Sequence, residues 1–393
     1  MSQRELFLSY LAQTSPSPLL LEISKAEGVY LYSPEGKKYI DLIAGIGVSN
    51  IGHRHPKVIA AIEQQLQKYL HLMVYGEYVQ SPQNLLAQKL HSLLPAHLDN
   101  IYLVNSGSEA IEGALKLAKR FTGRQELMSC YQAYHGSSHG ALSVGGSEYF
   151  KQAYRPLLPA IKHIHYGNLA DLEQISEKTA CVVIETIQGE AGVQIAEKSY
   201  FQALRKKCTE TGALLILDEI QAGFGRTGKL WAFEHFGIEP DILVLAKAMG
   251  GGMPIGAFIA SKNIMQSFSH NPILGHITTF GGHPLSSAAA LATLEVLTEG
   301  KIIEEVAYKA ELFRNLLKHP KIITIRNMGL MMAVEFESFG TLKPIIDKAI
   351  ALGVITDWFL FCDNAMRIAP PLSITEEEIQ EACRLILQAC EET

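Results

Sequence analysis

Residues 214–256 decide the fold, and they read LLILDEIQAGFGRTGKLWAFEHFGIEPDILVLAKAMGGGMPIG. The apolar run 214–217 ends in Asp218 and Glu219, and a second apolar run, 242–246, ends in Lys247 and a cluster of glycines. Short apolar runs that are bounded by polar and turn residues are typical of buried strands. The separation between the two runs suits a crossover connection, so the pattern predicts two parallel strands that lie side by side.

Asp218 and Lys247 are the candidate catalytic residues of this stretch. Ligands of open α/β sheets bind outside the carboxyl ends of the strands, so both side chains are expected to face one pocket. Taken alone, Lys247 fits a surface charge, and Asp218 fits a helix cap or an ion-pair partner. Together they suit pyridoxal phosphate, whose aldehyde needs a nucleophilic lysine and whose ring nitrogen needs an acid.

The rest of the chain alternates strand-like and helical segments. Such alternation predicts an α/β fold with a mostly parallel sheet that is covered by helices. The predicted helices between the strands include 108–121 and 199–211. The strand-like runs lie at residues 101–105, 126–130, 180–186, 213–219, 241–247 and 256–261.

The two ends of the chain are expected to form a second, smaller α+β domain. Residues 28–42 indicate a hairpin around a Pro-Glu-Gly turn, and an isolated hairpin is only marginally stable. We therefore expect residues 1–50 to join the C-terminal part of the chain, residues 286–393. The large cofactor-binding domain is then predicted to span residues 51–285.

The composition of the 393 residues limits the class of protein. Hydrophobic residues make up 48% and charged residues 19%, which is typical of a globular chain with a large core. The net charge of −6 argues against nucleic acid or an anionic membrane as a partner. No stretch resembles a signal peptide or approaches the ~20 apolar residues of a membrane span. The six cysteines are scattered without a C-x-x-C pair, so we expect buried free thiols and a cytoplasmic protein.

Other residues suit cofactor or substrate binding. The Ser-Gly-Ser stretch 106–108 lies between a predicted strand and a predicted helix, where a helix N-terminus binds phosphate; an ordinary N-cap is the alternative. Tyr134 suits stacking on a flat cofactor, or core packing. Arg367 suits a bidentate clamp on a substrate carboxylate, or a surface salt bridge. The H-x-H pairs at 53–55 and 163–165 lack further ligands at metal spacing, so we assign no metal.

The segment GFGRTGK, residues 223–229, matches two nucleotide-binding patterns at once, G-x-G-x-x-G and G-x-x-x-x-G-K. Four residues, 219–222, separate Asp218 from the first glycine, whereas a dinucleotide fingerprint begins almost at the end of its strand. Leu230 stands where a phosphate-binding loop needs a hydroxyl for magnesium. We therefore favour a flexible loop beside the pocket over a nucleotide site.

In their order and spacing, the motifs of the chain resemble those of the class III (ω-amino acid) aminotransferases, pyridoxal-phosphate enzymes of fold type I. The likeness is to the acetylornithine and ornithine aminotransferase type, and it covers almost the whole chain. The motifs that carry it are GVYLYSPEGKKYIDLIAGIGV, IGHRHPKV, NSGSEAIEGALKLAKR, AYHG, ETIQGEAGV, LDEIQAGFGRTG, LAKAMGGGMPIGA, HITTFGGHPL, MGLMMAVEF and MRIAPPL.

The resemblance implies a role for each matching residue. Lys247 looks like the lysine that holds the cofactor covalently and shuttles the proton, and Asp218 like the partner of the pyridinium nitrogen. Arg367 would bind a substrate carboxylate, and Glu190 would neutralise this arginine when an ω-amine arrives. The cofactor-binding set would be Ser106, Gly107 and Ser108 at the phosphate with Thr278 and the partner subunit's Thr279, Ile220 and Tyr134 on the ring faces, Gln221 near the ring hydroxyl, and His135 and Glu185 beside Asp218.

The implied reaction moves an amino group from an ω-amino or diamino acid, such as ornithine or N-acetylornithine, to 2-oxoglutarate in two half-reactions. The implied assembly is a homodimer with shared active sites. Donors such as 4-aminobutyrate or diaminopelargonate remain open, as does a same-fold aminomutase or racemase that needs no keto acid.

Three residues depart from the family pattern. Thr186 stands where many relatives carry proline, and His283 stands where asparagine is usual before the proline. Ser137 follows Tyr-His-Gly where acetylornithine-type relatives carry arginine. If that arginine reads a carboxylate, its absence weakens an acetylornithine assignment and leaves the amino donor open.

Overall fold

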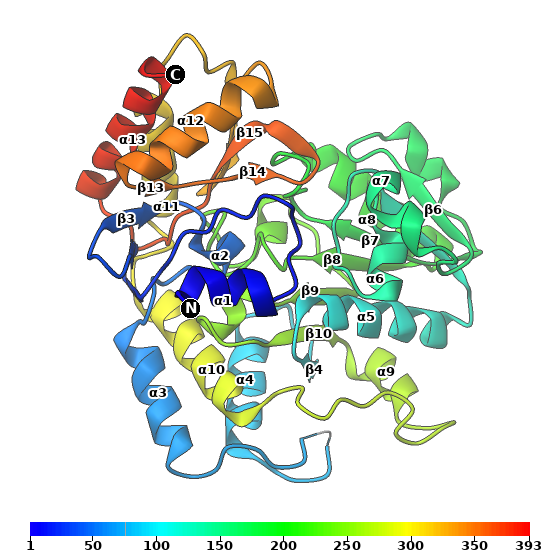
Figure 1. Ribbon diagram of the computed structural model, residues 1–393. Coiled ribbons are helices and arrows are strands. Elements are labelled where there is room, and N and C mark those ends of the chain that lie inside the picture. Colours follow the sequence, from blue (N-terminus) through cyan, green and yellow to red (C-terminus); the bar gives the residue numbers. More distant parts are fainter. Residues whose placement is uncertain (75) are drawn as a thin grey trace.

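The computed structural model describes residues 1–74 and 76–393 as a large lobe and a small lobe (Figure 1). The large lobe contains a central sheet and the helices α5, α6, α7 and α8 around it. The small lobe combines the C-terminal residues with strands from the N-terminal part.

The central sheet has seven strands, and it confirms the α/β prediction. Its order is β4 (Asn100–Val104), β10 (Gly256–Ala260), β9 (Ile242–Leu245), β8 (Leu214–Asp218), β7 (Thr179–Glu185), β5 (Glu126–Cys130) and β6 (Ile161–Ile164). All neighbours pair in parallel except β10, which runs antiparallel to both β4 and β9. The two apolar runs that decide the fold are β8 and β9, and they pair directly. The short edge strand β6 was not predicted.

Helices cover both faces of the sheet because its strands are apolar on both sides. Every residue of β7, β8, β9 and β10 is buried. Helix α5 (Gly107–Thr122) packs on one face of these strands, where alternate residues form one core cluster. The remaining strand residues pack with α8 (Lys198–Thr211) in a second cluster. The alternation in side-chain direction therefore places two cores on one sheet.

Three longer helices pack together below the sheet in Figure 1: α3 (Pro56–Leu66), α4 (Ser81–Ser92) and α10 (Pro284–Glu299). Helix α10 contacts both α3 and α4. Since those two helices precede the central sheet in the chain, α10 lies with the large lobe. We propose that the C-terminal part of the small lobe begins after Glu299 rather than at residue 286.

The small lobe is built on two four-stranded sheets. One has the order β1 (Lys25–Glu27), β2 (Tyr30–Tyr32), β3 (Lys38–Asp41) and β13 (Val354–Ile355), so the N-terminal hairpin pairs with a C-terminal strand. The other has the order β11 (Thr324–Met328), β12 (Met331–Glu335), β15 (Cys362–Ile368) and β14 (Trp358–Phe359). The helices of this lobe are α11 (Val306–Leu316), α12 (Phe339–Leu352) and α13 (Glu376–Glu391).

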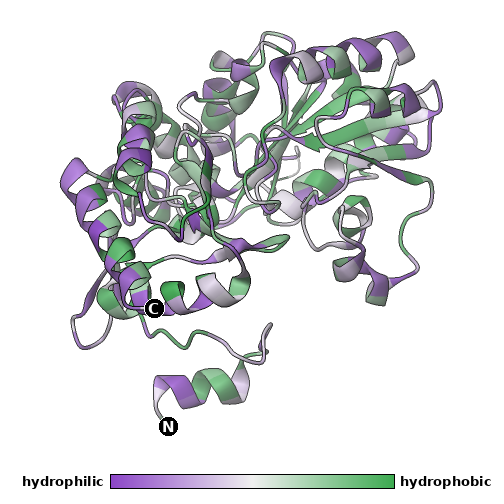
Figure 2. Cartoon of the chain, turned by 90° about the horizontal axis from the view of Figure 1, so that it is seen from above, coloured by the Kyte–Doolittle hydropathy of each residue, from purple (hydrophilic) through white to green (hydrophobic). Residues whose placement is uncertain are grey.

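Short helices complete the chain. They are α1 (Gln3–Tyr10), α2 (Ala44–Gly47), α6 (His139–Val144), α7 (Glu148–Lys151) and α9 (Lys262–Met265), with 3-10 turns η1 (Gln152–Tyr154), η2 (Ala170–Gln174), η3 (Ala232–His235), η4 (Lys247–Gly250) and η5 (Gln266–Phe268). Helix α1 stands apart from the body in Figure 2, and none of its residues is buried. In the described residues we find no helix with the length and apolar character to cross a bilayer.

The GFGRTGK segment is not the flexible loop that its sequence suggested. Residues 223–227 are buried. The Arg226 guanidinium donates to the carbonyl oxygens of Leu330 and Pro370, at 3.0 and 2.6 Å, and to the side chain of Asn50. These three acceptors come from distant parts of the chain, so the segment ties the lobes together, and nothing in its local sequence signals this.

Candidate functional site

A pocket of about 780 Å³ lies at the carboxyl ends of the central strands. It is formed by the segments that follow β4, β5, β7, β8 and β9, as expected for an open α/β sheet. Of the residues predicted to act together, the pocket brings eleven to its wall: Ser106, Gly107, Ser108, Tyr134, His135, Glu185, Glu190, Asp218, Ile220, Gln221 and Lys247.

Lys247 and Asp218 reach the same pocket because their strands are parallel neighbours. Asp218 is the last residue of β8, and Lys247 follows β9 and opens η4. The Lys247 backbone has φ of +46°, a conformation that L-residues other than asparagine and aspartate rarely adopt. Burial lowers the pKa of the Lys247 ammonium. A lysine that is held in this way is suited to nucleophilic chemistry.

The Asp218 carboxylate is held in one orientation by two donors. His135 Nδ1 lies 2.8 Å from Oδ2, and the backbone N–H of Ile220 donates to Oδ1 at 3.0 Å. Burial opposes a charged imidazole, but the Asp218 carboxylate outweighs it and raises the pKa of His135. His135 is therefore a partner that fixes the orientation of the Asp218 carboxylate.

The Glu185 carboxylate is hydrogen-bonded to the loops that form the pocket. Its two carboxylate oxygens accept the backbone N–H groups of Tyr134, at 3.0 Å, and Gly189, at 2.9 Å. Burial raises the pKa of Glu185 to about 7. The carboxyl group thus fixes the segment that carries Tyr134.

The opposite wall of the pocket is the N-terminus of α5. Ser106 is the N-cap, since its hydroxyl accepts the N–H of Glu109 at 3.2 Å, so the capping alternative also holds. Gly107 and Ser108 form the first turn, where backbone N–H groups have no partner within the helix. A Cβ on Gly107 would lie 2.7 Å from Cδ1 of Ile220, so a larger residue here would displace the end of the Ile220 side chain. An anion-binding helix end, a buried lysine and a fixed carboxylate in one pocket fit pyridoxal phosphate.

Neither Thr278 nor Thr279 lines the pocket of the chain to which it belongs. The Thr278 hydroxyl accepts from Nδ2 of Asn105, at 3.1 Å, just outside the pocket. Thr279 is exposed, and neither threonine lines the pocket. The role of the partner subunit's Thr279 therefore stays a prediction.

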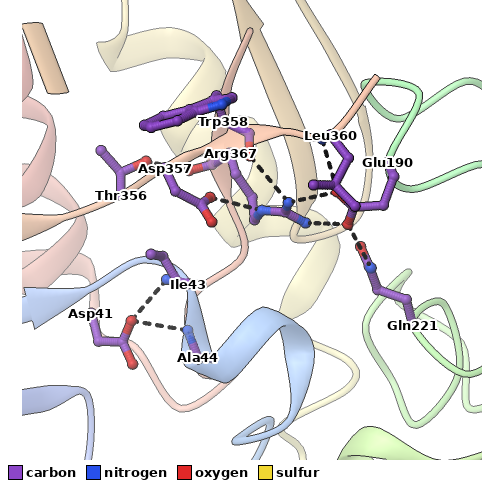
Figure 3. A network of polar contacts seen from close by, with 10 residues as sticks. All are labelled: Asp41, Ile43, Ala44, Glu190, Gln221, Thr356, Asp357, Trp358, Leu360 and Arg367. Atoms are coloured by element: carbon purple, nitrogen blue, oxygen red, sulfur yellow. Dashed lines mark hydrogen bonds and ion pairs between the residues drawn. The ribbon is translucent and has the colours of Figure 1, made fainter. Parts of the chain in front are cut away.

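Arg367 lies behind Glu190 at the small-lobe side of the site (Figure 3). Its Nη1 and Nη2 donate to the two Glu190 oxygens at 2.9 and 3.0 Å, and the arginine is only 3% exposed. Burial opposes ionisation of Glu190, but the guanidinium outweighs it and lowers the Glu190 pKa. Glu190 lines the pocket and Arg367 does not, so a ligand carboxylate can reach Arg367 only if Glu190 moves.

Two contacts of this network were missed by sequence reasoning. Asp357 accepts from Nε of Arg367 at 2.8 Å, and the backbone N–H of Leu360 donates to Glu190 at 3.1 Å. The only available signal was the hairpin pattern before Arg367, which places Asp357 beside it on the neighbouring strand segment. Gln221 also reaches this side, since its amide donates to Glu190 at 3.4 Å.

The chain belongs to the class-III aminotransferase family, whose model matches residues 10–390. Members of this family use pyridoxal phosphate to transfer amino groups of small amino-acid substrates, so the fold and the pocket belong to a pyridoxal-phosphate-dependent transaminase.

Particular relatives narrow the likeness. The chain is 40% identical to the acetylornithine aminotransferase of Methanocaldococcus jannaschii over 369 residues, which cover 90% of this chain and 89% of that protein. It is also 40% identical to the putrescine aminotransferase of Pectobacterium atrosepticum, over 88% of this chain and 77% of the relative. Among solved structures, the ornithine aminotransferase of Toxoplasma gondii superposes with a TM-score of 0.92 at 29% identity, over 100% of this chain and 96% of that one.

Proposed function

We propose that this transaminase moves the terminal amino group of an ω-amino or diamino acid, of the ornithine or N-acetylornithine type, to 2-oxoglutarate by a ping-pong mechanism. The observation that carries the proposal is the bidentate Glu190–Arg367 pair at the edge of the pocket. An arginine that is neutralised by a movable acid can serve two substrates, one with a carboxylate at this position and one without.

The residues of the pocket divide the work. Pyridoxal phosphate, when bound, supplies the electron sink for breaking a bond at the substrate carbon. The Lys247 amine holds the cofactor and moves the proton between the reacting carbons. The Asp218 carboxylate, oriented by His135, keeps the ring nitrogen protonated. The N-terminus of α5 would bind the phosphate of the cofactor, beside Ile220.

In this proposal, the two half-reactions differ at Glu190. While the ω-amine donor is bound, Glu190 stays paired with Arg367 and leaves the pocket wall without a free guanidinium. When the dicarboxylate acceptor arrives, Glu190 moves away and Arg367 binds the carboxylate next to the keto group. One pocket thus accepts both substrates in turn.

A diamine donor of the putrescine type is the second candidate. Among the described residues that line the pocket, Lys247 is the only lysine or arginine, and Ser137 stands where acetylornithine-type relatives carry arginine. A donor without a carboxylate needs no second cation. The Pectobacterium relative supports this candidate, and the Methanocaldococcus relative supports the first.

The test is a panel of ornithine, N-acetylornithine and putrescine with 2-oxoglutarate, followed by glutamate formation. Parallel lines in double-reciprocal plots at several acceptor concentrations are expected for a ping-pong mechanism. The pyridoxamine form of the enzyme should be converted by 2-oxoglutarate alone. If it is not consumed, an aminomutase or racemase becomes the better assignment.

We also propose a homodimer in which each pocket is completed by the partner subunit's Thr279. The support is the exposure of Thr279 outside the pocket of its own chain and the family resemblance. Light scattering on a size-exclusion column should give twice the chain mass of 43.2 kDa. A monomer with full activity would contradict the shared site.

A further inference from the structure

The Arg367 guanidinium is surrounded on three sides. Its Nη edge is bound by Glu190, its Nε donates to Oδ1 of Asp357 at 2.8 Å, and its Cζ lies 4.4 Å from the centre of the Phe359 ring. A second carboxylate is therefore bound to a guanidinium that Glu190 already neutralises.

The two acids belong to different parts of the molecule. Glu190 follows β7 in the large lobe, and it is the acid that faces the pocket. Asp357 lies in the small lobe, directly before β14, and the backbone N–H of Arg367 donates to the Asp357 carbonyl oxygen at 2.9 Å. The Thr356 hydroxyl donates to the carbonyl oxygen of Arg367 at 2.6 Å. Asp357 and Arg367 are thus held side by side in one hairpin (Figure 3).

The contacts of Glu190 allow its carboxylate to leave while its backbone stays. Its carbonyl oxygen accepts the N–H of Phe361 at 3.0 Å, which anchors the main chain. Apart from Arg367, the carboxylate is held by the N–H of Leu360 and by a long contact with Gln221. When that carboxylate leaves, Asp357 is the remaining carboxylate on the guanidinium among the described residues.

We propose that Asp357 is a positioning residue that fixes the Arg367 guanidinium through Nε while a substrate carboxylate replaces Glu190. This inference rests on the proposed exchange at Glu190 and extends it to a residue outside the pocket wall. An arginine side chain has several rotatable bonds and would otherwise follow Glu190 or rotate out of the bidentate geometry. Asp357 thereby sets the affinity for carboxylate-bearing substrates and leaves amine donors without a carboxylate unaffected.

The test compares Asp357→Ala and Asp357→Asn in the holoenzyme. Alanine removes the acceptor, whereas the asparagine side-chain oxygen still accepts from Nε. The matched control is Asp241→Ala, because Asp241 binds Arg205 at 2.7 Å with 28% of its side chain exposed, against 30% for Asp357, and does not line the pocket. Asp357→Ser, whose side chain is too short to reach Nε, replaces the alanine variant if that variant does not fold.

The two half-reactions give the first readout. Asp357→Ala should raise the KM for 2-oxoglutarate by roughly tenfold, the loss expected for one charge-assisted hydrogen bond. The KM for putrescine should change by no more than about twofold, because putrescine has no carboxylate for Arg367 to bind. Asp357→Asn should recover most of the affinity for 2-oxoglutarate. An unchanged 2-oxoglutarate KM in Asp357→Ala, or an equal loss for both substrates, would overturn the inference.

Binding of glutarate gives a readout that needs no turnover. Calorimetry should show glutarate binding weakened about as much as the 2-oxoglutarate KM in Asp357→Ala and unchanged in Asp241→Ala. If the wild-type enzyme fails to use 2-oxoglutarate but glutarate binding still depends on Asp357, the proposed acceptor is wrong and the inference holds. If wild-type turnover is normal and glutarate binds Asp357→Ala as tightly as wild type, the inference alone is wrong.

Discussion

The two ends of the pocket are built in different ways. At the cofactor end, Glu185 and Asp218 end the neighbouring strands β7 and β8 and Lys247 follows β9, so the strand register fixes their relative positions. At the carboxylate end, Glu190 comes from the large lobe and Arg367 from the small lobe, and only side-chain contacts join them. We therefore expect the first end to stay fixed by the sheet, whereas the proposed exchange opens the second end when a ligand replaces one acid.

The largest effect is expected at the rigid end, from Lys247→Ala. The loss of the nucleophile and proton carrier should lower turnover by at least ~10⁴-fold. The cofactor should still bind, because the α5 N-terminus and Asp218 remain, and its absorbance spectrum should report the free aldehyde form. Steady-state assays and spectra measure both.

Lys229→Ala is the matched control for that lysine, since Lys229 is exposed and lies in the GFGRTGK segment. It should retain full turnover, and a loss of nucleotide binding in this variant would instead favour the rejected nucleotide site. Wild-type turnover in Lys247→Ala would remove the cofactor end from the mechanism altogether.

Asp218→Asn tests the same end with a smaller change. The amide keeps the shape of the side chain but cannot hold the ring nitrogen protonated, so kcat should fall ~10²–10³-fold, the range for loss of one preorganised electrostatic partner. The KM values of both substrates should change little, because neither substrate touches Asp218. Asp241→Asn is the control, and an unchanged kcat in Asp218→Asn would contradict the role of the acid.

The difference between the two ends also explains what the sequence could predict. Asp218 and Lys247 follow apolar runs, and strand periodicity places both at one edge of a sheet without any knowledge of tertiary contacts. The contact of the Leu360 N–H with Glu190 depends on how the β14–β15 hairpin meets the large lobe. No local pattern encodes such a contact. From the residues alone, the sequence therefore predicted only Arg367 at the carboxylate end, and the family resemblance added Glu190.

Two further features lay beyond local patterns for the same reason. The segment 223–229 has a loop-like composition, yet its residues 223–227 are buried, and Arg226 donates to the carbonyl oxygens of Leu330 and Pro370. Helix α10 lies with the large lobe because it packs on α3 and α4, and this packing depends on the complete tertiary structure. Periodicity predicted most of the strands and helices, but it did not predict how they pack against one another.

At the exchangeable end, Arg367→Lys should separate the two substrates. Lysine keeps the charge but cannot contact Glu190 and Asp357 through one planar group. The KM for 2-oxoglutarate should rise roughly 10- to 100-fold, with little change for putrescine. Arg205→Lys is the control, because Arg205 also binds an aspartate. Equal losses for both substrates would show that Arg367 supports the fold rather than the acceptor.

The smallest expected effect is a pH dependence of the free energy of unfolding. It distinguishes the two ends of the pocket because the pKa of Glu185 is raised and the pKa of Glu190 is lowered. Burial raises the pKa of Glu185 to about 7 from 4.5, so its contribution to stability is present below pH 4.5 and is lost as the pH rises through 7. Burial opposes ionisation of Glu190 too, but Arg367 lowers its pKa, so its contribution is present above pH 4.5 and is lost as the pH falls.

Urea unfolding of the cofactor-free protein between pH 3 and 8 measures both contributions. The wild-type free energy of unfolding should lose roughly 3 kcal/mol through Glu185 between pH 4.5 and 8. Glu185→Gln should flatten this loss and leave the acid side unchanged, whereas Glu190→Gln should flatten the acid side alone. The same pH profile in both variants would mean that the two ends of the pocket are electrostatically one unit, and the division between a rigid and an exchangeable end would fail.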